Sequence, residues 1–217
     1  MIDIHTHKNN SKGFFIKNLF PEDEPREPQE KQYFSIGLHP WKISEANWEK
    51  QIKLLENKIP NKKIIAIGEI GLDKLVKVPP DLQFGVFEKQ LKIAEIHNLP
   101  VIIHSVKSNS EILKFRKRYS KTNWILHGFA GNIIEARALI EKQIYLSFGS
   151  AVLKSPKVAD TITRIETNKI FFETDDSNLS INKVYSRAAE ILKIDLEELR
   201  KIIKNNFSEC FGEIINE

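Results

Sequence analysis

The stretch IIAIGEI, residues 64–70, decides the fold class. It is an almost continuous apolar run, rich in isoleucine, that ends beside a single carboxylate, Glu69. Such runs are typical of parallel strands covered on both faces, whereas half-exposed antiparallel strands alternate apolar and polar residues. Seven other runs share this character. We therefore expect strands at residues 2–7, 13–20, 33–39, 64–70, 101–106, 124–127, 144–148 and 170–175.

Amphipathic helical stretches separate most of these runs. Ser108 with Glu111 forms a capping-box pattern at the start of one helix, and Asp195 is an N-cap candidate for another. Strands that alternate with helices indicate βαβ units, and about eight of them favour a closed (β/α)8-like TIM barrel over an open sheet. The chain has 217 residues, fewer than the roughly 250 typical of that barrel. We expect one domain, residues 1–217.

The N-terminal part is where we expect the barrel to be trimmed. Only residues 8–12 separate the first two expected strands, whereas a parallel crossover usually takes about a dozen residues or more. Strand 13–20 should therefore run antiparallel to strand 2–7. That arrangement would leave about seven parallel strands.

The composition is that of a folded protein with a mild basic surplus. It is 41% hydrophobic and 29% charged, with a net charge of +4 and a pI near 9.0. This surplus permits an anionic substrate without requiring one. The single cysteine, Cys210, excludes an internal disulfide framework and indicates a reducing compartment. No apolar run approaches a membrane span and no leader precedes the first strand, so we expect a cytoplasmic protein without a membrane partner; no protein partner can be inferred.

Potential metal ligands gather at the ends of the expected strands. In a barrel the carboxyl ends of all strands meet on one face, so residues scattered in the sequence become neighbours. Imidazole and carboxylate groups together suit zinc, manganese or magnesium. A His-x-His pair at one strand end points both rings to the same side, although alone it is a weak signal that packing or a surface position can also explain. The candidate ligands are His5, His7, Glu69, His104, His127 and Asp175, and a further histidine, His39, stands at another strand end.

These residues stand in motifs that resemble the TatD-type metal-dependent DNases of the amidohydrolase superfamily. The motifs are IDIHTH (2–7), IGLHPW (36–41), AIGEIGLD (66–73), PVIIHS (100–105), ILHGFAGN (125–132), YLSFGS (145–150) and FFETDD (171–176). The resemblance implies a metal-dependent hydrolase with a TIM barrel. It further implies a phosphodiesterase or deoxyribonuclease whose substrate is nucleic acid, at DNA or RNA ends.

The same resemblance implies two divalent metal ions and a role for each ligand. One ion would be held by His5, His7 and Asp175, and the other by His104 and His127, with Glu69 bridging both. Two such ions lower the pKa of a shared water and clamp the attacking and leaving oxygens of a phosphodiester. Asp175 would also be the general base.

Other positions are candidates for substrate contact or for support of the ligands. His39, Trp41 and Lys107 are expected to contact substrate, with a packed Trp41 and a supporting His39 as equal alternatives. Asp73 or Asp176 could support the ligands from behind. The basic residues of the run 114–121 should form a solvated helix face rather than a DNA surface.

The chain departs from the family pattern at the fifth expected strand. Family members usually carry an arginine where this chain has Val106, and Lys107 is not equivalent because it lacks the planar guanidinium fork. The family's proline after the ETD segment is also absent. An amidohydrolase-type hydrolase of a small amide, ester or lactone is therefore the alternative. A catalytically idle metal-binding scaffold is a third possibility that no substituted ligand supports.

Overall fold

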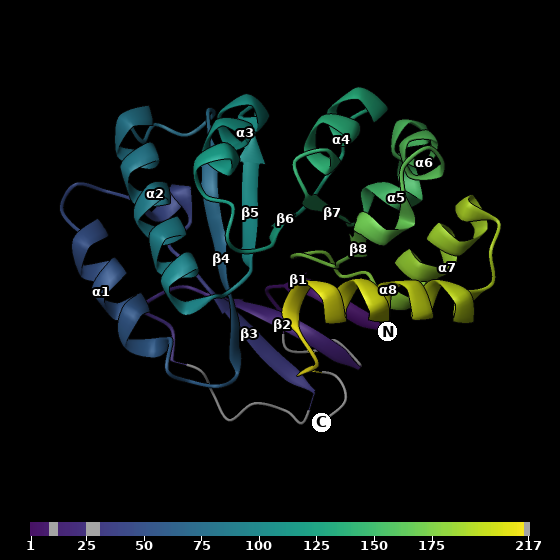
Figure 1. Cartoon of the computed structure of the whole chain (residues 1–217), viewed down its shortest axis with the longest axis horizontal. Helices are drawn as coiled ribbons and strands as arrows, with labels where there is room; N and C mark the ends of the chain where they lie inside the picture. Colours follow the sequence, from purple (N-terminus) through teal and green to yellow (C-terminus); the bar gives the residue numbers. More distant parts are fainter. Residues whose placement is uncertain (9–12, 25–30, 215–217) are drawn as a thin grey trace. The chain divides into compact units, whose positions relative to one another are not determined.

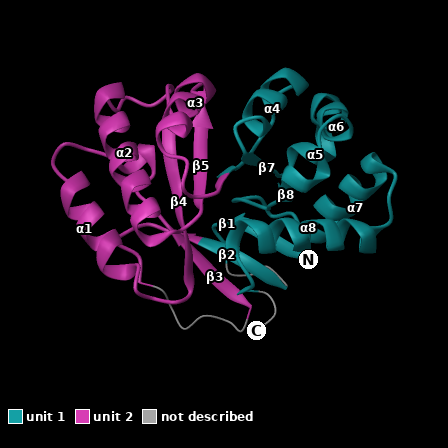
Figure 2. Ribbon diagram, viewed as in Figure 1, with its two compact units in different colours: residues 1–17, 125–217 teal, residues 18–124 magenta. Residues whose placement is uncertain are grey.

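A computed structural model describes residues 1–8, 13–24 and 31–214. Two compact units divide the chain, unit 1 with Met1–Lys17 and Ile125–Glu217 and unit 2 with Asn18–Trp124 (Figure 2). Within the described residues, no helix is long and apolar enough to cross a membrane. Those residues contain eight strands, one at each expected position. They are β1 (Ile2–Thr6), β2 (Phe14–Leu19), β3 (Gln32–Ile36), β4 (Ile64–Asp73), β5 (Val101–Val106), β6 (Trp124–Leu126), β7 (Ile144–Phe148) and β8 (Ile170–Phe172).

Unit 2 is built around the parallel strands β3, β4 and β5. All ten residues of β4 are buried, as its continuous apolar pattern predicts. In Figure 1, helix α2 lies between β4 and α1, and α3 packs on β5. The helical elements are η1 (Pro40–Lys42), α1 (Trp48–Lys58), α2 (Pro80–His97) and α3 (Asn109–Arg118).

Unit 1 brings the first and last strands of the chain together. β8 pairs in parallel with β7, and Thr6 at the end of β1 forms a parallel bridge with Asp175 just after β8. Adjacent first and last strands are what closure of a barrel requires. Its helices are α4 (Ile133–Ile140), α5 (Ala151–Lys154), α6 (Pro156–Thr163), η2 (Thr167–Lys169), α7 (Ile181–Leu192) and α8 (Leu196–Phe211).

The expected antiparallel pairing of the first two strands is wrong. β1 and β2 are parallel, with Ile2 opposite Phe14 and Thr6 opposite Lys17. From Thr6 the chain must return about 13 Å, the length of four strand residues, to reach the level of Ile2. The eight residue steps from Thr6 to Phe14 can span roughly 26 Å when extended. A crossover without a helix is therefore long enough, and the usual minimum applies to crossovers that carry one. Residues 9–12 of this connection lie outside the described part.

Two glycines allow β4 to lie close against β5. A Cβ on Gly68 would be 2.6 Å from the Cβ of Ile102. Gly71 has a φ of +152°, and a Cβ there would be 1.9 Å from the carbonyl oxygen of His104. No other residue fits at either position. The spacing G-E-I-G thus fixes Glu69 on the strand next to His104.

The two expected helix caps have different outcomes. Asp195 is the N-cap of α8, and its Oδ1 accepts a hydrogen bond from the Glu198 amide at 2.7 Å. The expected capping box at Ser108 is wrong, because the Ser108 hydroxyl donates to the carbonyl of Val106. Glu111 instead accepts from Lys74 Nζ at 2.8 Å. A cation from the preceding βα loop is the stronger partner for that carboxylate.

Candidate metal centre

Unit 1 gathers four of the predicted ligands. The Nε2 atoms of His5 and His7 lie 3.6 and 3.5 Å from one oxygen of Asp175, its Oδ1. The ring of His127 lies 4.4 Å, centroid to centroid, from that of His5. The His5 side chain is fully buried, whereas those of His7 and Asp175 are 30% and 42% exposed. This cluster is therefore closed on the His5 side and accessible on the Asp175 side.

The spacing of this unit 1 cluster fits a divalent ion. Ligand bonds of about 2.0–2.2 Å in a tetrahedron place neighbouring ligand atoms about 3.3–3.6 Å apart. The two nitrogen–oxygen distances at Asp175 match that range and are too long for good hydrogen bonds. His5, His127 and Asp175 also offer three ligand atoms that all lie within 4.8 Å of one another. Two imidazoles and a carboxylate are a donor set that zinc and manganese accept.

Backbone contacts with β1 hold Asp175 in place. Its φ is +52°, a left-handed conformation that aspartate tolerates better than most residues. Its amide donates to the His5 carbonyl at 3.0 Å, and its own carbonyl accepts from the His7 amide at 3.2 Å. The Thr6 hydroxyl donates to the same carbonyl at 3.1 Å. β8 therefore ends at Phe172 rather than at residue 175, because the chain turns to meet β1.

Two buried carboxylates of this unit 1 cluster were not predicted from the sequence. Asp3 accepts from the Thr174 amide at 3.0 Å and from its hydroxyl at 2.6 Å, which fixes the turn before Asp175. Glu173 accepts from the Gly128 amide at 2.8 Å and lies 3.3 Å from His127 Nδ1. Each stands two residues before a ligand. Strand alternation on β1, which puts Asp3 on the same side as His5, could have revealed Asp3, whereas Glu173 lies beyond the end of β8, where alternation does not apply.

The electrostatics of Glu173 favour its charged form. Complete burial raises the pKa of its carboxyl group, because a charge is poorly solvated there. The hydrogen bond with His127 and the charges of His127 and His5 outweigh that effect, so the pKa lies below the ordinary value. An ionised Glu173 orients the His127 ring, because it faces Nδ1 and leaves Nε2 for another partner.

Unit 2 holds a second cluster, centred on Glu69. Its Oε1 lies 3.1 Å from His39 Nε2 and 2.8 Å from His104 Nδ1. His104 Nε2 in turn lies 3.4 Å from Asp73 Oδ2. The Glu69 amide donates to Asn18 Oδ1 on β2. His39, Glu69 and His104 offer ligand atoms within 4.8 Å of one another, so this donor set also suits a divalent ion.

The tautomer of His39 follows from its surroundings. The Trp41 amide donates to His39 Nδ1 at 3.1 Å, so the neutral ring carries its proton on Nε2. That N–H points at Glu69 and donates to it. The structure thus makes His39 a hydrogen-bond partner of Glu69, and contact between His39 and substrate stays a prediction.

Two buried amides on α2 fix the loops that carry this unit 2 cluster. Gln90 accepts from the Leu38 amide at 2.7 Å and donates to the Leu38 carbonyl at 3.2 Å. Gln83 does the same at Asp73, with distances of 2.9 and 3.0 Å. Each glutamine satisfies a donor and an acceptor of one strand-end residue, which holds the loops after β3 and β4 in a single conformation.

Asp73 links the histidines to Trp41. Its Oδ2 accepts from Trp41 Nε1 at 2.7 Å, and its Oδ1 accepts from the Leu75 amide at 2.7 Å. Burial raises the pKa of Asp73, but these hydrogen bonds and the neighbouring His104 lower it by a larger amount, so the pKa lies below its ordinary value. Two other candidates, Lys107 and Asp176, are exposed.

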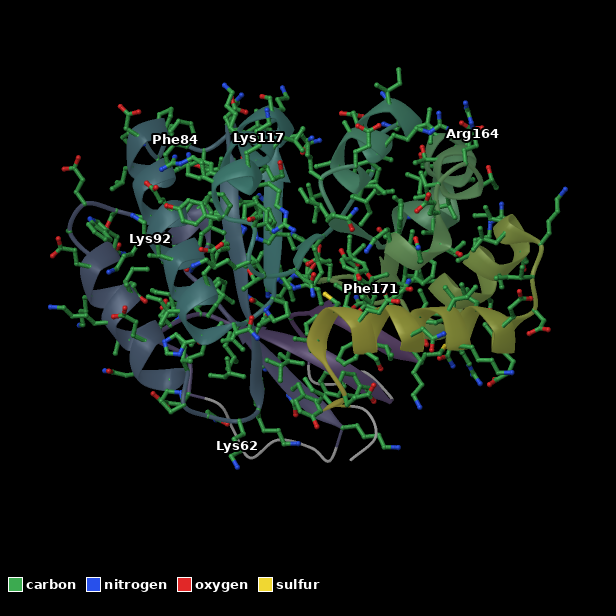
Figure 3. All side chains as sticks on the ribbon, in the orientation of Figure 1. Lys62, Phe84, Lys92, Lys117, Arg164 and Phe171 are labelled. Carbon is green, nitrogen blue, oxygen red and sulfur yellow. The ribbon has the colours of Figure 1, made fainter. Side chains whose placement is uncertain are left out.

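The basic run on α3 is not a uniform solvated face. Lys117 is exposed at the surface of unit 2 (Figure 3). Arg116, however, is buried and donates to the carbonyls of Tyr119 and Thr122. Its guanidinium lies 5.2 Å from the ring centroid of Trp124. For Arg116 the expectation is wrong, because a helix of this pitch places it on the same side as buried Ile112.

The predicted ligands therefore fall into two clusters, one in each unit. His5, His7, His127 and Asp175 belong to unit 1, and Glu69 and His104 to unit 2. The sharing of one ion by His104 and His127, and the bridging role of Glu69, join residues of different units and stay predictions.

Comparison with known proteins places the chain in a family. A family model described as TatD related DNase matches residues 24–212. The chain belongs to the TatD-related DNase family. This membership confirms the sequence-based prediction of a metal-dependent hydrolase.

Relatives of this TatD-family chain carry names that fit its two donor clusters. YabD of Bacillus subtilis, described as an uncharacterized metal-dependent hydrolase, is 29% identical over 199 residues, which cover 82% of this chain and 77% of that protein. The deoxyribonuclease Tat-D of Schizosaccharomyces pombe is 31% identical over 155 residues, which cover 65% and 50%. The crystal structure of YjjV, a TatD homologue from Escherichia coli, gives a TM-score of 0.81 at 23% identity over 98% of each chain. That likeness confirms the (β/α)8-like TIM barrel.

Proposed function

We propose that this TatD-family chain is a metal-dependent phosphodiesterase that hydrolyses DNA or RNA ends. The observation that carries the proposal is the spacing at Asp175, whose Oδ1 faces His5 and His7 Nε2 at distances suited to a shared ion. Membership of the family and the name of the fission-yeast relative support a nucleic-acid substrate. The cofactor would be two divalent ions per chain, of zinc, manganese or magnesium. The ligands would be His5, His7, Glu69, His104, His127 and Asp175.

The chain's own residues would orient and deprotonate the attacking water. Bound divalent ions would supply Lewis acidity and neutralise charge on the phosphate. Asp175 is the best placed general base, because its side chain is 42% exposed while its backbone is tied to β1. Proton transfer from water to Asp175 leaves hydroxide to attack phosphorus, and the leaving oxygen takes a proton from solvent. Glu69, whose Oε1 contacts His39 and His104, would serve as a carboxylate ligand.

We also propose that residues 1–217 act as one catalytic domain, located in the cytoplasm. The family match spans both units of the chain, which supports a single functional domain. Cys210 is buried in α8, and a lone buried thiol suits a reducing compartment.

The test compares three substrates with protein that has been reconstituted with manganese, magnesium or zinc. These are a fluorescent single-stranded oligonucleotide, a simple phosphodiester and a simple ester. We expect cleavage of both phosphodiesters, abolished by a chelator and by joint replacement of His5 and His7 with alanine. His97→Ala is the matched control, because this exposed histidine lies at the end of α2. Hydrolysis of the ester alone would contradict the proposal and support the amide, ester or lactone alternative.

A further inference from the structure

An open groove in unit 2 lies beside the Glu69 cluster. It has a volume of about 630 Å³, within the range of small-ligand sites. One wall is the segment of residues 41–46 after β3, and the other is the segment of residues 76–79 after β4, with Leu82 of α2. The lining is mainly apolar and includes Trp41, Ile43, Val78 and Pro79.

Trp41 is a rigid aromatic surface in this groove. The residue is 64% exposed, which is unusual for so large an apolar group. The ring is nevertheless held in place, because its Nε1 donates to Asp73. The backbone amide of Trp41 also donates to His39 Nδ1. An exposed ring that is held in one orientation loses little conformational entropy when a second flat ring stacks on it. Packing therefore does not explain the exposure of Trp41, whereas a ligand would.

The groove begins next to the predicted metal ligands. The Trp41 ring centroid lies 4.9 Å from that of His39 and 5.9 Å from that of His104. Asp73 Oδ2 contacts both Trp41 Nε1 and His104 Nε2. A group stacked on Trp41 would therefore lie next to a phosphate bound at the Glu69 cluster, with no more than one side chain between them. In a nucleic acid, each phosphate has a flat aromatic base beside it.

We propose that the Trp41 groove binds the nucleobase next to the scissile phosphate. This inference rests on the proposed phosphodiesterase function and names the part of the substrate that gives affinity. Trp41 supplies the stacking face, and the apolar lining from Ile43, Val78 and Pro79 receives the edge of the base. The groove walls carry one exposed cation, Lys77, and one exposed anion, Glu45, so stacking rather than charge would supply the affinity. Stacking accepts any base, so the site would bind single-stranded ends with little sequence preference.

The test measures KM and kcat with a thymidine tetranucleotide and with methyl p-nitrophenyl phosphate, which has no base. Trp41→Ala should raise KM for the tetranucleotide by roughly tenfold or more, the value of one base–aromatic stack. Because Trp41→Ala also removes the hydrogen bond to Asp73, kcat can fall for both substrates, and the diagnostic is that KM rises several-fold more for the tetranucleotide than for the small diester. Trp41→Phe should restore most of the affinity, and Trp41→Leu should not. Leu75→Ala is the matched control, because Leu75 is 65% exposed on the neighbouring loop and does not line the groove.

Several results would overturn the inference. An unchanged KM for the tetranucleotide in Trp41→Ala would do so. An equal rise in KM for both substrates would show that Trp41 acts through Asp73 on the histidines. Full rescue by leucine would indicate an apolar occupant instead of a base.

Binding measured without turnover separates this inference from the proposed function. Tetrathymidylate should quench the tryptophan fluorescence of the wild-type protein, and Trp41→Phe should abolish the quenching. Quenching without cleavage of either diester would contradict the proposed function and leave the base site supported. Cleavage without quenching would support the proposed function and contradict the base site.

Discussion

Replacing Gly71 with alanine should force β5 away from β4 at His104. The new Cβ would lie 1.9 Å from the His104 carbonyl oxygen, so the strands must separate by roughly 1 Å to reach the shortest contacts that real Cβ atoms make. Overpacking of this kind costs about 1–3 kcal/mol. The φ of +152° adds a further 1–3 kcal/mol or so, because only glycine adopts it readily. We therefore expect a loss of about 2–6 kcal/mol in the free energy of unfolding.

The matched control is the same substitution at Gly85. This residue is exposed in α2, and a Cβ there would meet nothing within 4 Å. Alanine is the better helix former by about 1 kcal/mol, so Gly85→Ala should be stabilising. In a chain of this length 1 kcal/mol shifts Tm by about 2–4 °C. Thermal unfolding followed by circular dichroism should show a decrease of at least about 4 °C for Gly71→Ala and a small increase for Gly85→Ala.

Activity gives a second measurement on the same pair of variants. A shift of roughly 1 Å at His104 changes its distance from Glu69, and misplacement of that size can cost about 100-fold in rate. Gly85→Ala should keep wild-type kcat/KM. A Gly71→Ala protein with unchanged Tm and kcat/KM would refute the reasoning from strand proximity.

Three further changes test other parts of the structure. Asp175→Asn should keep the fold but lower phosphodiester turnover by roughly 10²–10⁴-fold, and near-normal turnover would remove Asp175 from the mechanism. Glu111→Gln should lower the free energy of unfolding by roughly 1 kcal/mol at pH 6, because the hydrogen bond from Lys74 lowers the pKa of Glu111 from 4.5 to about 2. The difference in stability from wild type should disappear as the pH falls from 4.5 towards 2, and a difference that stays constant with pH in urea titrations would contradict this. Val106 lies two residues after His104 on β5, and Val106→Arg should raise kcat/KM on oligonucleotides by about ten- to a hundredfold if the added guanidinium group forms bidentate hydrogen bonds with phosphate. Equal or lower cleavage by a folded, metal-loaded variant would count against a nuclease.

The strand positions could be predicted because their signal is local. Most residues of these apolar runs are buried, and residues 101–106 and 144–148 match β5 and β7 at both ends. The direction of β2 could not be read in the same way. It depends on whether a short connection can return beside β1, and chain length alone permits both directions. Asp175 is joined to β1 by backbone hydrogen bonds, which cannot be predicted from the pattern of side chains.

The candidate ligand residues could be chosen from the sequence, and their metal binding stays a prediction, but the contacts that hold them could not be foreseen. His5 and His7 stand out because histidines are rare at the ends of apolar strands. The tautomer of His39 depends on the Trp41 amide, and the anchoring of Trp41 depends on Asp73, which is distant in sequence. Such pairs become visible only when strands β3 and β4 are placed side by side.

Metal content measured on the purified chain after reconstitution tests the central claim most directly. Elemental analysis should find up to two divalent ions per chain, and joint replacement of His5 and His7 by alanine should lower that number while His97→Ala leaves it unchanged. The absence of stoichiometric metal, or equal occupancy in the His5 and His7 double variant, would contradict the account.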